Sequence, residues 1–256
     1  MTLSCSCIGC EIIKVKDLIR NAIWTTGAQG LVVGVSGGID SAVSCALAVK
    51  AVSAERVLGV SMPISHSRNE DENDAKELCA FLGVELITVP LGAVHQTFLA
   101  TEHISSASPI LSGNIAARLR MITLYNIAAE RNYLVCGTSN KTEYMIGYST
   151  KWGDSAADIQ PLLHLYKREI YEIAEDLEIP ESIMKKAPSA GFYNGQTDEA
   201  DIGLTYDELD TALFNLELND FVPKNKIEEK VLSLVEKSEH KRRLPISKFS
   251  LQQKIE

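Results

Sequence analysis

Short runs of apolar residues alternate along this chain with longer stretches in which apolar residues recur every three or four positions. The short runs are typical of buried parallel strands and cover residues 31–36, 56–63, 84–91 and 133–139. The longer stretches predict helices over residues 12–24, 37–52, 69–83, 113–132, 141–147, 165–177 and 223–239. Strands that alternate with helices predict an α/β fold: a doubly wound parallel sheet of the Rossmann type, with helices on both faces and helical additions near the C-terminus.

The length and composition suit a single globular domain. The chain has 256 residues, of which 45% are hydrophobic and 23% charged, which excludes a disordered, collagenous or coiled-coil protein. We expect one domain over residues 11–256, preceded by a flexible segment over residues 1–10. No apolar run reaches the roughly 18 residues of a transmembrane helix, and the N-terminus lacks the features of a secretory signal, so a cytoplasmic location is expected.

The formal net charge of −9 is unevenly distributed. Residues 198–210 carry six acidic and no basic side chains, which suggests an exposed or mobile segment. Residues 223–256 carry nine basic and five acidic side chains and either cover an anionic ligand or form a solvated end; charge alone favours the solvated end. The acidic remainder argues against broad contact with a nucleic-acid backbone.

Six cysteines fall into two groups. Cys45, Cys79 and Cys136 lie in apolar contexts and are expected in the core. The other three form a C-x-C-x-x-C pattern at the N-terminus, at positions 5, 7 and 10, which could bind a metal or act as a redox site. No further Cys or His cluster nearby completes a zinc site, so we expect free thiols in a frayed segment.

The first predicted strand ends in the sequence Ser36-Gly37-Gly38-Ile39-Asp40-Ser41, directly before a helix. Glycines and serines at such a turn expose backbone N–H groups and hydroxyls to phosphate oxygens, and the helix N-terminus adds partial positive charge. Asp40 is then suited to bind Mg²⁺, which bridges phosphates and carboxylates. The sequence is neither a Walker A motif nor a G-x-G-x-x-G fingerprint.

This S-G-G-x-D-S sequence after an apolar strand resembles the pyrophosphate loop of the ATP pyrophosphatases, the PP-loop superfamily with its adenine nucleotide alpha hydrolase-like fold. A more specific resemblance, to the ammonia-dependent NAD synthetases, is found in residues 137–143, 147–162, 188–210 and 239–242. It implies that the carboxylate of deamido-NAD attacks the α-phosphorus of ATP, and that ammonia displaces AMP from the adenylated carboxylate. Such chemistry depends on positioning and charge neutralisation.

The resemblance also implies roles for individual residues. The expected ATP-binding residues are Gly34, Val35, Ser36, Gly37, Gly38, Ile39, Asp40, Ser41, Thr138, Lys167 and Ser189. The expected deamido-NAD-binding residues are Asn114, Arg118, Lys151, Asp158, His240 and Lys241. Asp40 and Glu143 are expected to hold Mg²⁺, and the catalytic set comprises Asp40, Asp154, Asp158 and Lys167.

Within that set, Lys167 would neutralise phosphate charge, and Asp154 would accept a proton from ammonium or orient ammonia. Asp158 is flanked by apolar residues, where an unpaired carboxylate is costly, and this favours a ligand as its partner. Arg120 is close enough to Arg118 in sequence to exchange roles with it. Ser155 replaces a glycine that is common in relatives, so it could tune the activity.

The resemblance has consequences for the nitrogen donor and for assembly. Relatives that use glutamine have an additional glutaminase domain, for which 256 residues leave no room, so free ammonia is expected unless a separate glutaminase chain supplies it. Family members are homodimers, and the helices over residues 113–132 and near the N-terminus are the candidate interfaces. No nucleic acid or membrane is expected as a partner.

Two other functions remain open from the residues alone. Another ATP pyrophosphatase, acting on a purine nucleotide or tRNA, would be expected to show a basic surface or a catalytic C-x-x-C, and the acidic body argues against it. A non-catalytic nucleotide sensor would not need Glu143, Lys167 and the deamido-NAD residues together.

Overall fold

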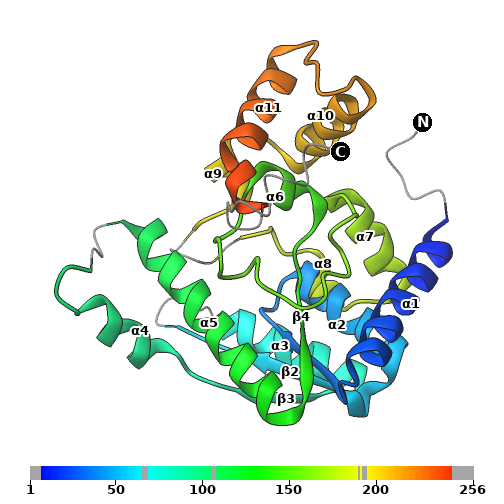
Figure 1. The fold of residues 1–256 in the computed structure, drawn as a ribbon, viewed down its shortest axis with the longest axis vertical. Helices are drawn as coiled ribbons and strands as arrows, with labels where there is room; N and C mark the ends of the chain where they lie inside the picture. The colour runs from blue at the N-terminus through cyan, green and yellow to red at the C-terminus, as the bar shows by residue number, and fades with distance from the viewer. Residues whose placement is uncertain (1–6, 65–68, 105–107, 190, 192–194, 244–256) are drawn as a thin grey trace.

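The computed structural model describes residues 7–64, 69–104, 108–189, 191 and 195–243. Within these residues one parallel sheet has the strand order β3-β2-β1-β4 (Figure 1). Its strands are β1 (Gly30–Gly34), β2 (Val57–Ser61), β3 (Glu85–Thr88) and β4 (Tyr133–Cys136). The predicted doubly wound α/β fold is confirmed, although each strand is shorter than its apolar run because the run continues into the turn that follows.

One face of the sheet is covered by α2 (Ile39–Val52) and α3 (Asn69–Leu82), and further helices pack against α2, so that all of them share a hydrophobic core with Leu31 and Val33 of β1. The further helices are α1 (Ile8–Thr26), α7 (Lys167–Asp176) and α8 (Glu181–Met184). Nearly every position of α2 is buried, which explains its small, apolar composition without an obvious polar face. The predicted core cysteines Cys45 and Cys79 are buried here as free thiols, and Cys136 is buried at the end of β4.

The opposite face packs Val32, Leu58 and Val135 against α5 (Pro109–Arg131), while α4 (Gly92–Leu99) contacts α5. Successive residues of β1 therefore point into different cores, as the strand period requires. Helix α5 begins four residues earlier than the pattern predicted, because Pro109 occupies its first turn. The sequence pattern did not predict α4, α8 (Glu181–Met184) or the two helices over Asp198–Ile202 and Tyr206–Leu218.

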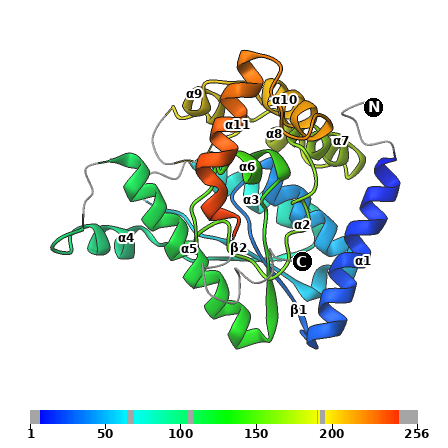
Figure 2. The same ribbon diagram turned by 45° about the horizontal axis from the view of Figure 1, so that its top comes forward.

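A helical layer lies over the sheet in both views of the molecule (Figures 1 and 2). It consists of α6 (Lys141–Ile146), α9 (Asp198–Ile202), α10 (Tyr206–Leu218) and α11 (Lys226–Ser238), and α11 is followed by the 3-10 turn Glu239–Lys241. Elsewhere in the chain, the 3-10 turn Ala54–Arg56 precedes β2. Helices α6, α10 and α11 share a third core with Leu209, Leu213 and Val231 at its centre. Helix α11 begins after Asn225, which caps it, so Pro223 lies outside its first turn.

The interpretation of residues 198–210 as an exposed segment is confirmed only in part, because four of its six acidic residues are exposed and the other two are buried. Asp198, Tyr206 and Asp210 are all buried, and the acidic side chains that remain exposed lie on the outer faces of α9 and α10. Asp210 accepts a hydrogen bond from Thr142 Oγ1 and another from the Arg168 N–H at 2.9 Å. Six acids in thirteen residues therefore reflect specific buried contacts as well as solvation, because buried carboxylates require hydrogen-bond donors.

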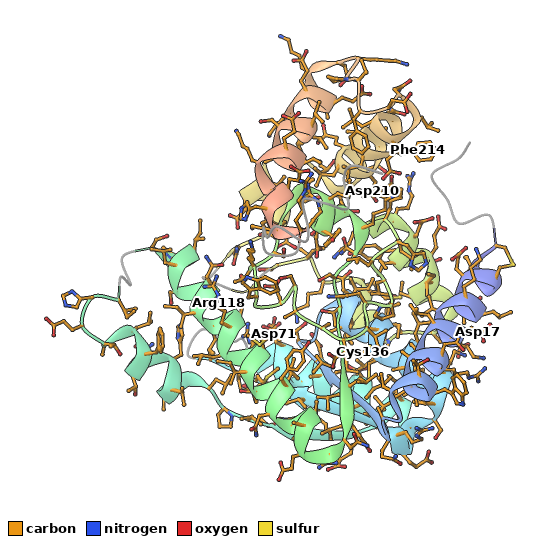
Figure 3. The ribbon with its side chains drawn as sticks, viewed as in Figure 1. Asp17, Asp71, Arg118, Cys136, Asp210 and Phe214 are labelled. Atoms are coloured by element: carbon orange, nitrogen blue, oxygen red, sulfur yellow. A yellow bond between two sulfur atoms is a disulfide. The ribbon has the colours of Figure 1, made fainter. Side chains whose placement is uncertain are left out.

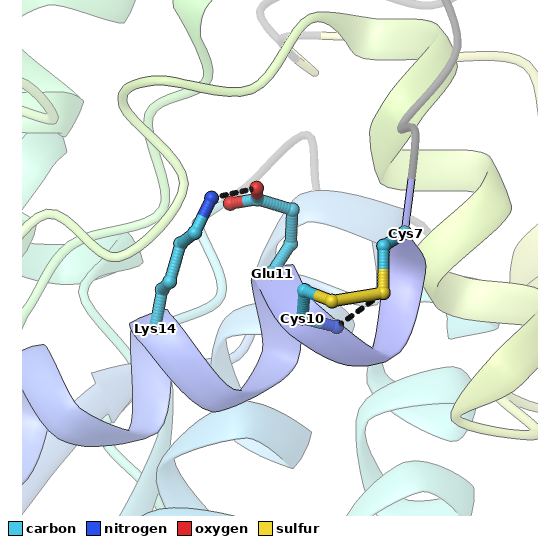
Figure 4. Close-up of a disulfide and its surroundings, with 4 residues drawn as sticks. All are labelled: Cys7, Cys10, Glu11 and Lys14. Atoms are coloured by element: carbon cyan, nitrogen blue, oxygen red, sulfur yellow. Dashed lines mark hydrogen bonds and ion pairs between the residues drawn. A yellow bond between two sulfur atoms is a disulfide. The ribbon is translucent and has the colours of Figure 1, made fainter.

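The expectation of free thiols at the N-terminus is wrong for two of the three cysteines. Cys7 and Cys10 form a disulfide in the first turn of α1 (Figure 4). Cys7 is the N-cap of the helix, and its Sγ accepts a hydrogen bond from the Cys10 N–H at 3.2 Å. Cys5 lies outside the described residues. Residues three positions apart are neighbours across one helical turn, so the C-x-x-C spacing brings the two sulfurs together.

Among the described residues, no helix combines the length and the apolar character needed to cross a membrane.

Candidate active site

The turn between β1 and α2 is built as the sequence predicted. Ser41 Oγ donates to Gly38 O at 2.8 Å and accepts from the Ser36 N–H at 3.2 Å, which closes the turn on itself. Gly37 has φ +80°, and a Cβ there would lie 2.5 Å from the carbonyl oxygen of Asp71, so only glycine is accommodated. The N–H groups in the first turn of a helix have no acceptor within that helix, and such groups are chemically suited to an anion.

A buried ionic cluster lies at the end of this turn. Lys167 Nζ contacts Asp40 Oδ2 at 2.5 Å and Glu143 Oε1 at 3.1 Å. Lys167 is only 1% exposed, although it is the first residue of α7, an amphipathic helix on which a lysine would ordinarily be exposed. The cluster joins the ends of β1 and β4, the adjacent strands whose carboxyl ends form the ligand-binding edge of an open parallel sheet.

The charges of the cluster perturb one another. Burial by itself lowers the pKa of Lys167, but the neighbouring charges of Asp40 and Glu143 outweigh it and raise that pKa. Burial raises the pKa of Glu143, and the charge of Lys167 opposes the rise. Lys167 therefore stays protonated, and two carboxylates share its single positive charge.

Asn140 connects the two sides of the cluster and was not predicted. It is fully buried as the N-cap of α6, where its Oδ1 accepts from the Glu143 N–H at 2.9 Å. Its Nδ2 donates to Asp40 Oδ1 at 3.0 Å. An Asn immediately before a helix is a recognisable cap signal, but the contact with Asp40 spans a hundred positions and has no local signal. Thr138 lies half-buried in the turn between β4 and Asn140.

The expected dinucleotide residues gather where α5 meets the loop after α6. Thr150 Oγ1 donates to Asn114 Oδ1 at 2.7 Å, and Arg118 Nη2 donates to the Lys151 carbonyl at 3.2 Å. Arg118 is exposed on α5 (Figure 3). Arg120 is half-buried, its Nε donates to the Met62 carbonyl at 3.2 Å, and desolvation lowers its pKa. Since Arg120 is held against the β2 end, Arg118 is the better placed of the two for a ligand.

Asp154 lies in the same loop. Its Oδ1 accepts from the Thr150 N–H at 2.8 Å, and Ser155 Oγ donates to the Thr150 carbonyl at 3.0 Å. Asp154 reaches solvent but is surrounded by protein, and the resulting desolvation raises the pKa of its carboxyl. A carboxylate with a raised pKa is a stronger base than an ordinary Asp, which suits a proton acceptor.

The carboxylate of Asp158 has partners within the chain, so its apolar neighbours do not by themselves require a ligand; its assignment to deamido-NAD and to the catalytic set stays a prediction. Its Oδ2 accepts from the Val135 N–H at 2.8 Å, and its Oδ1 accepts from Tyr125 Oη at 3.3 Å. Asp158 is also exposed rather than enclosed by its apolar neighbours, because Ile159 turns inward while Asp158 turns outward. Its carboxylate is therefore paired within the chain and anchors this loop to β4.

The remaining expected residues lie at the borders of the site. Lys241 Nζ donates to the carbonyls of Gly147 and Ser149, each at 2.7 Å, so it ties the end of α11 to the loop that contains Asp154. His240 beside it is exposed. Ser189 is half-buried and accepts from the Gly191 N–H at 3.2 Å. The structure thus joins Asp40 and Glu143 through Lys167, and it brings Asn114, Arg118 and Lys151 together at the loop that contains Thr150.

The fold and the site together define a nucleotide-binding α/β protein whose phosphate loop follows the first strand of a parallel sheet. A model of the family described as NAD synthase matches residues 11–245. The chain belongs to the NAD synthase family.

Named relatives support this placement. The chain is 48% identical over 241 residues to the NH(3)-dependent NAD(+) synthetase of Methanoregula boonei, with 92% of this chain and 94% of that protein covered. The structure of the NMN synthetase from Francisella tularensis is similar with a TM-score of 0.86 and 36% identity, covering 94% and 98% of the two chains. The NH3-dependent NAD synthetase from Campylobacter jejuni, solved with nitrate, has a TM-score of 0.81 and 30% identity over 95% and 99%.

Proposed function

We propose that this protein is an ammonia-dependent NAD synthetase that amidates deamido-NAD in an ATP-dependent reaction. A carboxylate is a poor acyl donor until its oxygen becomes part of a good leaving group. In the proposed reaction a carboxylate oxygen of deamido-NAD forms a bond to the α-phosphorus of ATP and pyrophosphate leaves. Ammonia then attacks the adenylated carbonyl carbon, AMP leaves with the electron pair of the broken C–O bond, and ammonia loses a proton.

The observation that carries this proposal is the buried Asp40–Lys167–Glu143 cluster beside the phosphate loop, in a chain that belongs to the NAD synthase family. We assign the turn from Ser36 to Ser41 to the phosphates of ATP, because its N–H groups and hydroxyls are hydrogen-bond donors at a helix N-terminus. We assign Asp154 to the ammonia step, since its pKa is raised and its partner Thr150 holds it in place.

The residues present suit Mg²⁺. Among the described residues, no group of three or more His, Cys, Asp or Glu side chains could hold a metal ion alone. Asp40 and Glu143 offer two carboxylates next to the phosphate loop, and Mg²⁺ is typically bound by one or two carboxylates together with substrate phosphates and water. When bound there, Mg²⁺ would neutralise phosphate charge as pyrophosphate leaves. Asp40 and Glu143 would share their negative charge between the metal ion and Lys167.

Arg118 and Lys151 are proposed to bind deamido-NAD through its phosphates or carboxylate, since both are cationic and lie together near Asp154. Asn114, His240 and Lys241 would border the same ligand. The protein is proposed to act as a homodimer, and the cytoplasmic location expected from the sequence stays a prediction.

The decisive assay combines purified protein, ATP, Mg²⁺ and deamido-NAD with either ammonium or glutamine, and follows NAD, AMP and pyrophosphate. NAD formed with ammonium but not with glutamine supports the proposal. The Asp40→Ala variant, purified in parallel, controls for a contaminating enzyme. AMP formed without NAD would keep the ATP chemistry and reject the substrate.

A second candidate is the amidation of nicotinate mononucleotide, favoured by the similarity to the Francisella tularensis NMN synthetase. The chemistry at the carboxylate is the same, and only the size of the nucleotide differs. Nicotinate mononucleotide is therefore run beside deamido-NAD in the same assay. A higher kcat/KM for the mononucleotide would replace the proposed substrate while retaining the mechanism.

A further inference from the structure

Tyr206, the first residue of α10, reaches the ionic cluster from the helical layer. Its hydroxyl lies 2.8 Å from Glu143 Oε1 and 2.9 Å from Asp198 Oδ2, and its side chain is buried. Its ring also lies against the charge of Lys167, with Nζ 4.8 Å from the ring centroid. Tyr206 is thus the point at which α9 and α10 contact the residues proposed to hold the metal.

The direction of the Tyr206 hydrogen bond follows from the neighbouring donors. A carboxylate oxygen carries no proton to donate, so the phenol of Tyr206 is the donor in both contacts. A phenol has one proton and donates to one carboxylate at a time. Tyr148 Oη donates to Asp198 at 3.0 Å, and Asp201, the other carboxylate near Tyr148, accepts from Gln196 at 2.6 Å. Asp198 therefore keeps a donor when the Tyr206 proton is directed at Glu143 Oε1, the nearer of its two acceptors.

The two oxygens of Glu143 are not equivalent. Oε1 accepts from both Tyr206 and Lys167, whereas Oε2 has no hydrogen bond or ion pair with any residue that the structure describes. The side chain is 18% exposed, so this oxygen is not sealed in the core. We propose that Tyr206 is a positioning residue for the metal site: it fixes Glu143 through Oε1 and leaves Oε2 to bind the cation. The proposal rests on the assignment of Asp40 and Glu143 as metal ligands.

The test compares Tyr206→Phe with Tyr166→Phe. The first variant removes the hydroxyl but keeps the ring that contacts Lys167. The second removes a similar hydrogen bond, from Tyr166 Oη to Glu217 at 3.0 Å, in the same hydrophobic core but outside the metal site. Each variant is titrated with MnCl2 in the presence of a non-hydrolysable ATP analogue, and free Mn²⁺ is followed by EPR.

We expect Tyr206→Phe to weaken Mn²⁺ binding by about tenfold, the usual lower range for an outer-sphere partner of a metal ligand. Its kcat falls, while its KM for deamido-NAD stays within about twofold of wild type. Tyr166→Phe leaves Mn²⁺ binding and kcat unchanged. Unchanged Mn²⁺ affinity in Tyr206→Phe would overturn the proposal, as would an equal loss in both variants, because that loss would come from the shared core.

The variant Glu143→Gln tests the role of Tyr206 separately from the assignment of Glu143 as a metal ligand. If Glu143→Gln loses Mn²⁺ affinity and Tyr206→Phe does not, the metal site stands and the role of Tyr206 is rejected. If Glu143→Gln binds Mn²⁺ as wild type does, the metal assignment itself is rejected, and the role of Tyr206 with it. Thermal denaturation of each variant shows the temperature range in which all are folded, and the titrations are made within it.

Discussion

At the scale of single residues, the site is defined by the balance of charge around Lys167. Its one positive charge is buried and is shared between two partly exposed carboxylates, so removing one carboxylate leaves the buried charge poorly compensated. Asp40 is the carboxylate that also borders the phosphate loop. Its loss would therefore affect both the metal and the position of Lys167.

Asp40→Ala is expected to lower kcat for NAD formation by at least about a hundredfold, the range for removing an electrostatic partner of the transition state. The measurement is NAD formation at saturating ATP, together with circular dichroism to establish that the variant is folded. Turnover near the wild-type value would reject Asp40 as a metal ligand.

Asp154→Asn tests the proposed base without losing its position, because Asn can still accept from the Thr150 N–H. We expect kcat/KM for ammonia to fall by at least about tenfold and KM for ATP to stay within about twofold. The stability of the variant, unlike its activity, should increase near neutral pH. Desolvation raises the folded-state pKa of Asp154, so at a pH above that pKa the ionised carboxylate lowers the free energy of unfolding. Below the ordinary pKa of 3.8 the carboxyl is protonated in both the folded and the unfolded state, and this destabilisation disappears.

The variant should therefore unfold at a higher urea concentration than wild type near neutral pH, and this gain should shrink as the pH falls. A loss of both activity and stability would instead indicate that Asp154 only supports the loop.

At the scale of secondary-structure elements, the turn between β1 and α2 depends on its contact with α3. Gly37 has a positive φ and lies against the backbone of Asp71, so the turn packs directly on the first turn of α3. Lys186 supports this arrangement, since its Nζ contacts Asp71 at 2.5 Å and Asp74 at 2.6 Å.

Gly37→Ala is expected to weaken binding of a non-hydrolysable ATP analogue by at least about tenfold, because the new Cβ must displace backbone and a non-Gly residue at this φ costs about 1–2 kcal/mol. Isothermal titration calorimetry gives the affinity. Gly83→Ala is the matched control: Gly83 also has a positive φ, of +68°, but its Cβ would meet nothing closer than 3.9 Å. It should lose stability and retain the affinity, and an equal loss of affinity in both variants would contradict the role of Gly37.

At the scale of the whole molecule, exposed apolar side chains mark two candidate interfaces. Helix α5 exposes Ile110 and Ile122, with Phe98 of α4 on the neighbouring helix, and α1 exposes Leu18 and Trp24. Large apolar groups that gather on a surface often mark a protein contact. Helix α5 is the better candidate, because its exposed apolar side chains are joined by one from the neighbouring helix α4.

Ile122→Lys is expected to shift the protein from dimer to monomer in sedimentation velocity, and Trp24→Lys to leave the dimer intact. A charge in a desolvated interface is unpaired and costs several kcal/mol. Dissociation in Trp24→Lys alone would move the interface to α1, and a monomeric wild type would reject the dimer.

The sequence by itself determined the four strands, seven of the helices and the place of the phosphate loop. These follow from local features: apolar periodicity over a few residues, and the glycines and serines of the turn from Ser36 to Ser41. Family resemblance added Glu143 and Lys167, which no local pattern distinguishes from surface helix residues.

Only the tertiary structure decided what these residues contact. Lys167 and Asp40 are 127 positions apart, and Tyr206 reaches Glu143 across 63, so no periodicity links them. The acidic segment of α9 and α10 reads as solvated because charge alone predicts exposure, and the packing of three helices instead buries Asp198 and Asp210. Burial of a charged group depends on the partners that the whole fold supplies, and those partners come from distant parts of the chain.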